Sequence, residues 1–488
     1  MRALLAALAC LGASGAWASE TTAADDFSAG AIARPVVSFP SGTAKATVLL
    51  VSDEAGWGET EAGIATELTG AGAIVVGVDL PSWRAGLAPE ARKCLYLVAD
   101  LETISHAVQR QAQLDSYLPP IVAGIGAGAA QLLAMAAQTP KATIGRTVVV
   151  DPTDSVDLAK PLCTDATATT LADGETRYGL APGPLPDPIE IGLTPAAPTD
   201  GAALARALQT GHPDVSVEQV AGPAPAALTT RVSAAIEAAA GAEGEAPLGL
   251  PLTLLPATPT RDTMAIVFSG DGGWRDIDQK IGGALQEMGI PVVGFDSLRY
   301  FWSEKTAAGT AADLDRLIRL QAPAWGVSKV LLVGYSFGAD LLPATYNALP
   351  DETKARIPMV SLLALTSASS WQISVLGWLG QATGTGGNPA DAIARMDPAI
   401  VQCIHGAEED DSPCPGLAAK GVEVIRTDGG HHFDGDYEAL ARKIAAGLDR
   451  RLPAGTAAAV PAAPPVPPAT NDVPAASPET AEEAPTAP

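Results

Sequence analysis

The chain has 488 residues, of which 47% are apolar, 17% are charged and 5% are aromatic. It is too long for one ordinary domain and too apolar to be mainly disordered, so we expect two domains plus extensions. With 30 basic and 55 acidic side chains, the formal net charge is −25. This balance argues against nucleic-acid binding, because neutralising phosphates requires a basic face.

The chain opens with the pattern of a secretory signal peptide. A short basic start, Met1-Arg2, precedes an apolar stretch, and Ala16-Trp17-Ala18 supplies the small residues of a cleavage site. The stretch falls short of the roughly 20 apolar residues that a membrane anchor needs, and no later segment reaches that length. We therefore predict an exported protein whose signal peptide, residues 1–18, is cleaved after Ala18.

The cysteines predict disulfides. Removal of the signal peptide leaves an even number of cysteines, which are Cys94, Cys163, Cys403 and Cys414. An exported chain meets an oxidising compartment, where such cysteines pair. We expect bridges between Cys403 and Cys414 and between Cys94 and Cys163, with four buried free thiols as the alternative.

The middle of the chain contains two copies of one α/β pattern. Apolar strand-like runs alternate with helical stretches, as in a parallel sheet covered by helices on both faces. Thr47–Trp57 parallels Met264–Trp274, and Ile121–Gly128 parallels Leu331–Gly338. We expect domains at residues 30–240 and 252–452, a linker at 241–251, and a disordered Pro/Ala-rich tail at 453–488.

The second copy contains a candidate nucleophile. Gly334-Tyr335-Ser336-Phe337-Gly338 follows a Val/Leu strand and opens a helix, which is the context in which a Gly-x-Ser-x-Gly motif is meaningful. The glycines permit a turn tight enough to present the Ser336 hydroxyl at the carboxyl end of the sheet. The alternative is a Gly/Ser helix start used only for packing.

A serine nucleophile needs a base, and two adjacent histidines are candidates. His431 and His432 follow a strand-like run that ends near Ile425, where this architecture positions its base. We favour His432 as the base and leave His431 open, the other histidine serving as an orienting group or substrate contact. His405 ends an apolar run and is expected to be structural.

The acid that orients the imidazole should lie between the nucleophile and the histidine. An acidic loop follows the candidate strand 399–406, and in it we choose Asp411, then Asp410 and Glu409. A bridge from Cys403 to Cys414 would fix this loop against its strand. The alternative is an ordinary solvated acidic loop.

A glycine-rich loop at 269–274 is the candidate source of an oxyanion hole. We expect one donor to be the Phe337 amide and the second to be the amide of Gly270 or Asp271. A phosphate-binding loop is excluded, since no Gly-Lys-Ser/Thr follows. The pattern calls for no cofactor or metal. The first copy has Gly126 in place of Ser336 and Ala224-Pro225 in place of the histidines, so it is degenerate.

These motifs resemble the AcvB/VirJ family of exported bacterial virulence proteins, within the α/β-hydrolase superfamily. The resemblance rests on segments 268–274, 334–340, 411–414 and 430–434. It implies two tandem α/β-hydrolase-like domains with mostly parallel sheets flanked by helices, the first degenerate. It also implies a periplasmic serine esterase that removes lysine from lysyl-phosphatidylglycerol at the membrane surface, with secretion-system proteins as partners.

A cationic lysyl headgroup suits an acidic protein, which suggests groups that bind it. The candidate substrate-binding residues are Asp271, Asp296, Asp340, Trp274 and Tyr300. The aspartates have an alternative role as helix caps. The aromatic residues 300–302, and those from Trp371 to Trp378, are candidates for an interfacial or acyl-chain contact, with core packing as the alternative. Competing functions are a generic carboxylesterase or thioesterase, and a non-enzymatic scaffold for type IV secretion.

Overall fold

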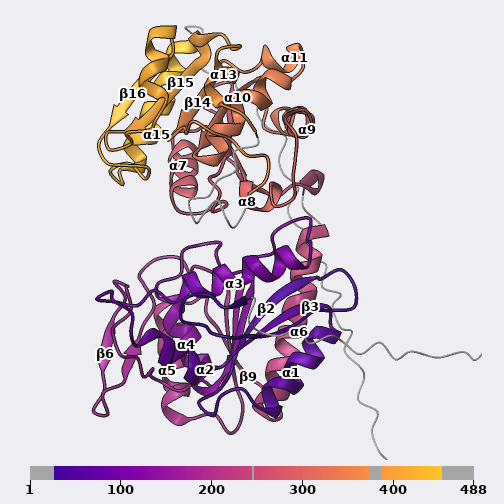
Figure 1. The fold of residues 1–488 in the computed structure, drawn as a ribbon, viewed down its shortest axis with the longest axis vertical. Coiled ribbons are helices and arrows are strands. Elements are labelled where there is room, and N and C mark those ends of the chain that lie inside the picture. Colours follow the sequence, from indigo (N-terminus) through magenta and orange to yellow (C-terminus); the bar gives the residue numbers. More distant parts are fainter. Residues whose placement is uncertain (1–26, 245–246, 374–385, 453–488) are drawn as a thin grey trace, which may run out of the picture.

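The computed structural model describes residues 27–244, 247–373 and 386–452. The predicted signal peptide and Pro/Ala-rich tail lie outside the described residues. Figure 1 shows two α/β lobes. We call residues 27–244 the first domain and residues 247–452 the second domain.

Each domain is built on a seven-stranded sheet whose first strand is an antiparallel edge strand and whose other strands are parallel. In spatial order the first sheet contains β1 (Val36–Ser38), β3 (Ala73–Val78), β2 (Ala46–Val51), β4 (Ile121–Ile125), β5 (Arg146–Val150), β8 (Ile189–Leu193) and β9 (Ser216–Gln219). The second contains β10 (Leu252–Leu255), β12 (Val292–Phe295), β11 (Thr263–Phe268), β13 (Lys329–Tyr335), β14 (Met359–Leu363), β15 (Val401–Gly406) and β16 (Glu423–Thr427).

Helices flank both sheets. Those of the first domain are α1 (Glu59–Gly70), α2 (Leu80–Leu87), α3 (Val98–Gln111), α4 (Gly126–Ala136), α5 (Thr199–Gly211) and α6 (Ala224–Gly244), with a separate hairpin of β6 (Ala168–Thr170) and β7 (Thr176–Tyr178). Those of the second are α7 (Asp276–Glu287), α8 (Ser297–Tyr300), α9 (Ala307–Ala324), α10 (Phe337–Ala348), α11 (Asp351–Lys354), α13 (Pro389–Ile393), α14 (Cys414–Leu417) and α15 (Tyr437–Arg451).

The two sheets are copies of one another in strand order and in register. Val51 lies opposite Gly124 in the first sheet, and Phe268 lies opposite Gly334 at the equivalent point of the second. The order, with its antiparallel edge strand and two-sided helical cover, is that of an α/β-hydrolase-like fold. The predicted fold class, a tandem pair of such domains, is confirmed.

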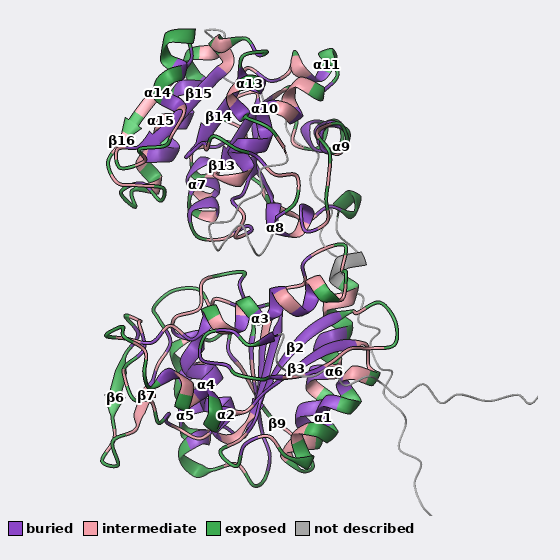
Figure 2. Ribbon diagram, in the orientation of Figure 1, coloured by how far each residue is buried: buried purple, intermediate pink, exposed green. Residues whose placement is uncertain are grey.

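Both faces of each sheet are buried, which is why the strands are almost continuously apolar. Along β11, Ile266 packs into one core with α9 and α10, whereas Val267 packs into the other with α7 and α15. Figure 2 shows the strands as a buried layer between helices whose outer surfaces are exposed.

A tryptophan packed on a glycine recurs in both domains. A Cβ added to Gly77 would lie 2.1 Å from the Trp57 ring, and one added to Gly294 would lie 2.4 Å from the Trp274 ring. Each glycine therefore leaves the space that the indole fills. Trp274, proposed above as a substrate contact, is 5% exposed and belongs to the core.

Both predicted disulfides, Cys94–Cys163 and Cys403–Cys414, are present. The connection between the domains is shorter than the predicted linker, because α6 extends to Gly244 and β10 begins at Leu252. No helix in the described ranges has the length and apolarity that would let it cross a membrane.

The Trp274–Gly294 contact gives a test of the core. We expect Gly294→Ala to lower the free energy of unfolding of the full chain by about 1–3 kcal/mol, since the added methyl overpacks a filled core. The matched control is Gly283→Ala in α7, where an added Cβ meets nothing within 4 Å. That helical substitution should be neutral or stabilise by up to about 1 kcal/mol. Equal effects of the two changes in chemical denaturation would contradict this packing.

Candidate active site

Ser336 lies on a sharp turn between β13 and α10. Its backbone has φ 50° and ψ −117°, a conformation that is strained for a non-glycine residue. The turn is possible because Gly334 and Gly338 lack side chains: a Cβ on Gly334 would lie 2.6 Å from the Gly338 carbonyl, and one on Gly338 would lie 2.5 Å from the Phe268 carbonyl. The predicted nucleophile therefore stands at the carboxyl edge of the sheet.

The histidine that reaches Ser336 is His431. Its Nε2 lies 2.8 Å from the Ser336 Oγ. The preference for His432 was wrong, because the His432 Nδ1 lies 3.0 Å from the Tyr335 hydroxyl. Adjacent residues of this loop point in different directions, and spacing in the sequence does not distinguish them.

The acid partner is Glu409, the third choice of the sequence analysis. Its Oε1 lies 2.8 Å from the His431 Nδ1, and its Oε2 accepts a 2.7 Å hydrogen bond from the Gly406 amide. Its side chain is 7% exposed. Asp410 and the preferred Asp411 are exposed instead, so the choice of Asp411 was wrong. Glu409 immediately follows the turn at the end of β15, and its longer side chain folds back to that strand end.

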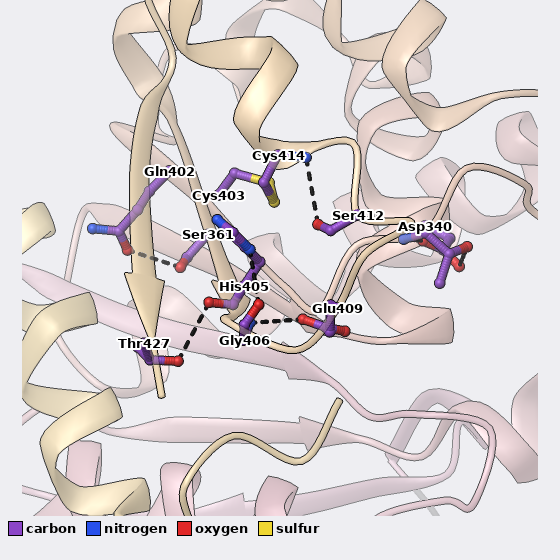
Figure 3. The surroundings of a disulfide bond; sticks show 11 residues. Asp340, Ser361, Gln402, Cys403, His405, Gly406, Glu409, Ser412, Cys414 and Thr427 are labelled. Atoms are coloured by element: carbon purple, nitrogen blue, oxygen red, sulfur yellow. Dashed lines mark hydrogen bonds between the residues drawn. A yellow bond between two sulfur atoms is a disulfide. The ribbon is translucent and has the colours of Figure 1, made fainter. Parts of the chain in front are cut away.

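The Cys403–Cys414 disulfide closes this acidic loop onto its strand, as Figure 3 shows. Cys403 lies in β15 and Cys414 begins α14, so the bridge joins the two ends of the loop that carries Glu409. Within the loop, the Cys414 amide donates to the Ser412 hydroxyl. His405, expected to be structural, is buried, and its Nδ1 lies 3.0 Å from the Gly406 carbonyl.

The pKa values of the two partners shift toward the charged pair. Burial would raise the pKa of Glu409, but hydrogen bonds from His431 and the Gly406 amide lower it below its ordinary value. The hydrogen bond to Glu409 raises the pKa of His431, against burial, and the charges of Asp271 and Asp340 raise it further. Glu409 is thus an anion that stabilises an imidazolium, as a triad acid must be.

Of the two candidate oxyanion amides, that of Gly270 is engaged elsewhere. The carboxyl group of Asp278, buried within α7, interacts with the Gly270 amide. Burial raises the pKa of Asp278 well above its ordinary value, and the Gly270 bond opposes this. Gly270 therefore anchors the loop, and the amide of Asp271 is the better candidate.

The first domain supplies independent support for the Asp271 amide. There Asp53 occupies the position of Gly270, and its Oδ1 accepts 2.8 Å hydrogen bonds from the amides of both Glu54 and Ala127. These amides are the equivalents of the Asp271 and Phe337 amides. One carboxylate oxygen thus sits where two backbone donors converge, which is the geometry of an oxyanion hole. The first domain keeps the hole but fills it with its own side chain.

Three of the candidate substrate-binding groups have structural roles instead. Asp296 caps α8 by accepting from the Arg299 amide, and burial raises its pKa to about 6. Asp340 accepts from the amide and hydroxyl of Thr366, and burial raises its pKa to about 7. The buried Tyr300 donates to Asp313. Asp271, partly exposed, is the remaining acidic candidate beside the triad.

A series of aromatic rings begins next to the nucleophile. The ring of Phe337, next to Ser336, is 5.3 Å from that of Phe301, which is 6.3 Å from that of Trp371. Phe301 and Trp302 are buried, so they belong to the core, whereas Phe337 and Trp371 are partly exposed. Trp378 lies outside the described residues. Among the residues described, no group of His, Cys, Asp or Glu could hold a metal ion.

Residues 262–452 match the family model of the bacterial virulence protein VirJ. The second domain is therefore a VirJ family domain with an α/β-hydrolase fold, which confirms the resemblance for that part of the chain. No curated protein sequence matches this chain significantly.

Three solved structures illustrate the fold similarity. Est1E from Butyrivibrio proteoclasticus, bound to ferulic acid, has 14% identity and a TM-score of 0.31, and the match covers 41% of this chain and 95% of that one. The thioesterase domain from the curacin biosynthetic pathway has 16% identity, coverage of 40% and 94%, and a TM-score of 0.28. A hormone-sensitive lipase from a metagenome library has 16% identity, coverage of 46% and 87%, and a TM-score of 0.29. The fold assignment rests on the strand order above, not on these distant similarities.

The acid and base assignments can be tested with matched variants. We expect Glu409→Gln and His431→Gln to reduce hydrolysis of a p-nitrophenyl ester, Glu409→Gln by as much as about 10⁴-fold. Asp411→Asn and His432→Gln should leave most of the activity. Because His431 must be neutral to accept a proton, kcat/KM should rise with pH through a pKa above 6.5, and Glu409→Gln should move this limb to lower pH. A greater loss of activity in Asp411→Asn than in Glu409→Gln, or in His432→Gln than in His431→Gln, would refute the assignment.

The blocking of the hole by Asp53 can be reproduced in the second domain by a single substitution. In Gly270→Asp, the new carboxylate should accept from the Asp271 and Phe337 amides, as Asp53 does from their equivalents. We expect kcat to fall by about 10²–10³-fold, the usual cost of losing an oxyanion donor. Gly270→Ala is the control, since its Cβ would meet the Tyr335 ring at 3.2 Å without adding a carboxylate. Equal losses in both variants would mean that crowding, not occupation of the hole, is responsible.

Proposed function

We propose that the second domain is a serine hydrolase that cleaves the aminoacyl ester of lysyl-phosphatidylglycerol. The observation that carries the proposal is the continuous hydrogen-bonded series from Glu409 through His431 to Ser336, each step 2.8 Å long. This arrangement is that of an acyl-transfer triad.

The residues fit each step of ester hydrolysis. Ser336 Oγ attacks the ester carbonyl while His431 Nε2 takes its proton, and the Phe337 and Asp271 amides bind the oxyanion. The tetrahedral intermediate collapses as His431 returns the proton to the departing glycerol oxygen, leaving an acyl-enzyme. Water, deprotonated by His431, then attacks the acyl carbon, and Ser336 leaves with the proton as the amino acid is released.

The electrostatics support a cationic acyl group. Asp271, Asp340 and Glu409 all raise the pKa of His431, so the potential around the triad is negative. A lysyl group carries two ammonium charges and is attracted to such a site, whereas an anionic acyl group is repelled. Asp271 is the partly exposed carboxylate among those three that we assign to an ammonium contact.

The proposed location is the periplasm. Residues 1–18 have the composition of a signal peptide, and the two disulfides suit an oxidising compartment. The substrate lies at a membrane surface, where the half-buried Trp371 and Phe337 offer apolar contacts beside the nucleophile. The resemblance to the AcvB/VirJ family also implies secretion-system partners, which belong to the same proposal.

The deciding experiment incubates purified protein with vesicles containing lysyl-phosphatidylglycerol and measures released lysine. We expect release by the wild type and a loss of at least about 10³-fold in Ser336→Ala. Vesicles of phosphatidylglycerol with free lysyl esters of short alcohols form the matched control for lipid recognition. Equal lysine release by both proteins contradicts the proposal.

The competing functions give distinct results. Hydrolysis of short acyl esters or thioesters without lysine release indicates a generic esterase or thioesterase. If Ser336→Ala fully restores a deletion strain, the chain acts as a scaffold and its hydrolytic site is dispensable for that phenotype.

A further inference from the structure

One helix of the first domain packs against the edge of the second domain that carries the active site. The side chains of Glu102, His106 and Arg110 recur every four residues along α3, so they share one face of the helix. The segments of the second domain that they meet follow the carboxyl ends of β11, β12 and β14. Ser336 follows the carboxyl end of β13 in the same sheet. Figure 1 shows α3 at the side of the first domain that faces α8.

The first contact is an ion pair with the oxyanion loop. Arg275 Nη1 lies 2.8 Å from the Glu102 Oε1 and 2.8 Å from the Thr143 Oγ1, both in the first domain. The Arg275 and Glu102 side chains are only 23% and 20% exposed. Burial raises the pKa of Glu102, and Arg275 opposes this rise; burial would lower the pKa of Arg275, but the charges of Glu102 and its neighbours raise it. A partly buried charge pair of this kind has a well-defined geometry.

Arg275 is coupled to the oxyanion amide through a short hydrogen-bonded turn. Its amide donates to the Gly273 carbonyl, and the Gly273 amide donates to the Gly270 carbonyl. Asp271 lies within this turn. The turn is held at one end by Asp278 from within the second domain and at the other by Glu102 and Thr143 from the first.

The second contact fixes the aromatic side of the site. The Arg110 guanidinium donates to the backbone carbonyls of Trp302 and Ile373 and lies 3.5 Å from the centre of the Trp302 ring. The Trp302 carbonyl follows Phe301, whose ring adjoins that of Phe337, and the Ile373 carbonyl lies two residues beyond Trp371, whose ring adjoins that of Phe301. One side chain of the first domain thus joins two separate loops of the second.

The third contact is a shared core. Tyr117, from the loop after α3, is buried within the hydrophobic core of the second domain. Its ring lies 5.1 Å from that of Trp302 and 4.5 Å from that of His106. Burial lowers the pKa of His106 to about 3, so this ring is neutral in the interface.

We propose that the degenerate first domain is a positioning element for catalysis, in which Glu102, with Thr143, acts through Arg275 to hold the Asp271 amide in the oxyanion hole. The inference deepens the proposed function and rests on it for its kinetic consequence. It gives a reason for the retention of a copy without a nucleophile: its helix α3 contacts loops at the active-site edge of the second domain.

The test compares Glu102→Gln and Thr143→Val with wild type in the full chain. We expect kcat for a p-nitrophenyl ester to fall by about tenfold in Glu102→Gln, less than the 10²–10³-fold cost of removing an oxyanion donor, with KM changed by less than about twofold. Thr143→Val removes one of the groups that accept a hydrogen bond from Arg275, and it should give a smaller loss of kcat. Combining Glu102→Gln with Arg275→Met should cost no more than the Arg275→Met change alone.

The matched control is Glu237→Gln, which removes an exposed pair with Lys45 inside the first domain, 2.7 Å long. It should leave kcat unchanged. Melting temperatures of all variants separate positioning from unfolding, since a positioning effect lowers kcat at constant melting temperature. Unchanged kcat in both Glu102→Gln and Thr143→Val, or fully additive losses in the double variant, would overturn the inference.

A second readout does not depend on activity. Hydrogen exchange at the amides of residues 270–275 should accelerate in Glu102→Gln and not in Glu237→Gln, and unchanged exchange would overturn the inference. Labelling of Ser336 by a fluorophosphonate reports the proposed function separately. If the wild type is not labelled, the proposed serine hydrolase is contradicted. Accelerated exchange in Glu102→Gln would still show that the first domain holds this loop in place.

Discussion

The close approach of β13, α10 and the end of β11 is the constraint on which the site depends. Gly334 and Gly338 let these backbones meet, and the turn between them holds Ser336 at a positive φ. A serine in this conformation is kept there only because the surrounding sheet and helix determine it. The same turn persists in the first domain, where Gly126 has φ 57°. The first domain therefore has the same turn without the serine.

One residue distinguishes the backbone hole of the first domain from that of the second. Asp53 fills the hole of the first domain, and a Cβ at Gly126 would lie 2.3 Å from its Oδ1. A serine at position 126 would therefore clash with Asp53 in its present position. In the second domain, Gly270 has no side chain to occupy the hole, and its amide is held by Asp278. The exchange of one residue, aspartate for glycine, separates a closed hole from one that a substrate oxygen can enter.

Three carboxyl groups with little exposure hold the segments around the site. Glu409 orients the base, Asp278 anchors the oxyanion turn, and Glu102 pairs with Arg275 across the domain interface. Each carboxylate accepts hydrogen bonds from a defined group, which offsets the cost of removing it from water. Of the carboxylates near the triad, Glu409 and Asp271 are among those that raise the pKa of His431, and this charge suits the proposed cationic substrate.

The sequence by itself determined the fold class, the duplication, both disulfides and the candidate nucleophile. Apolar periodicity, a repeated motif and the number of cysteines can each be read from the chain without knowing which residues meet in space. It also limited the base to two adjacent histidines and the acid to three adjacent carboxylates. Only the tertiary structure selected His431 as the candidate base and Glu409 as the candidate acid, since the direction of a loop side chain depends on what packs around it. The same holds for Asp278, Glu102 and Arg110. Their partners are distant in the sequence, and no local pattern distinguishes a carboxylate that will be buried from one that will be solvated.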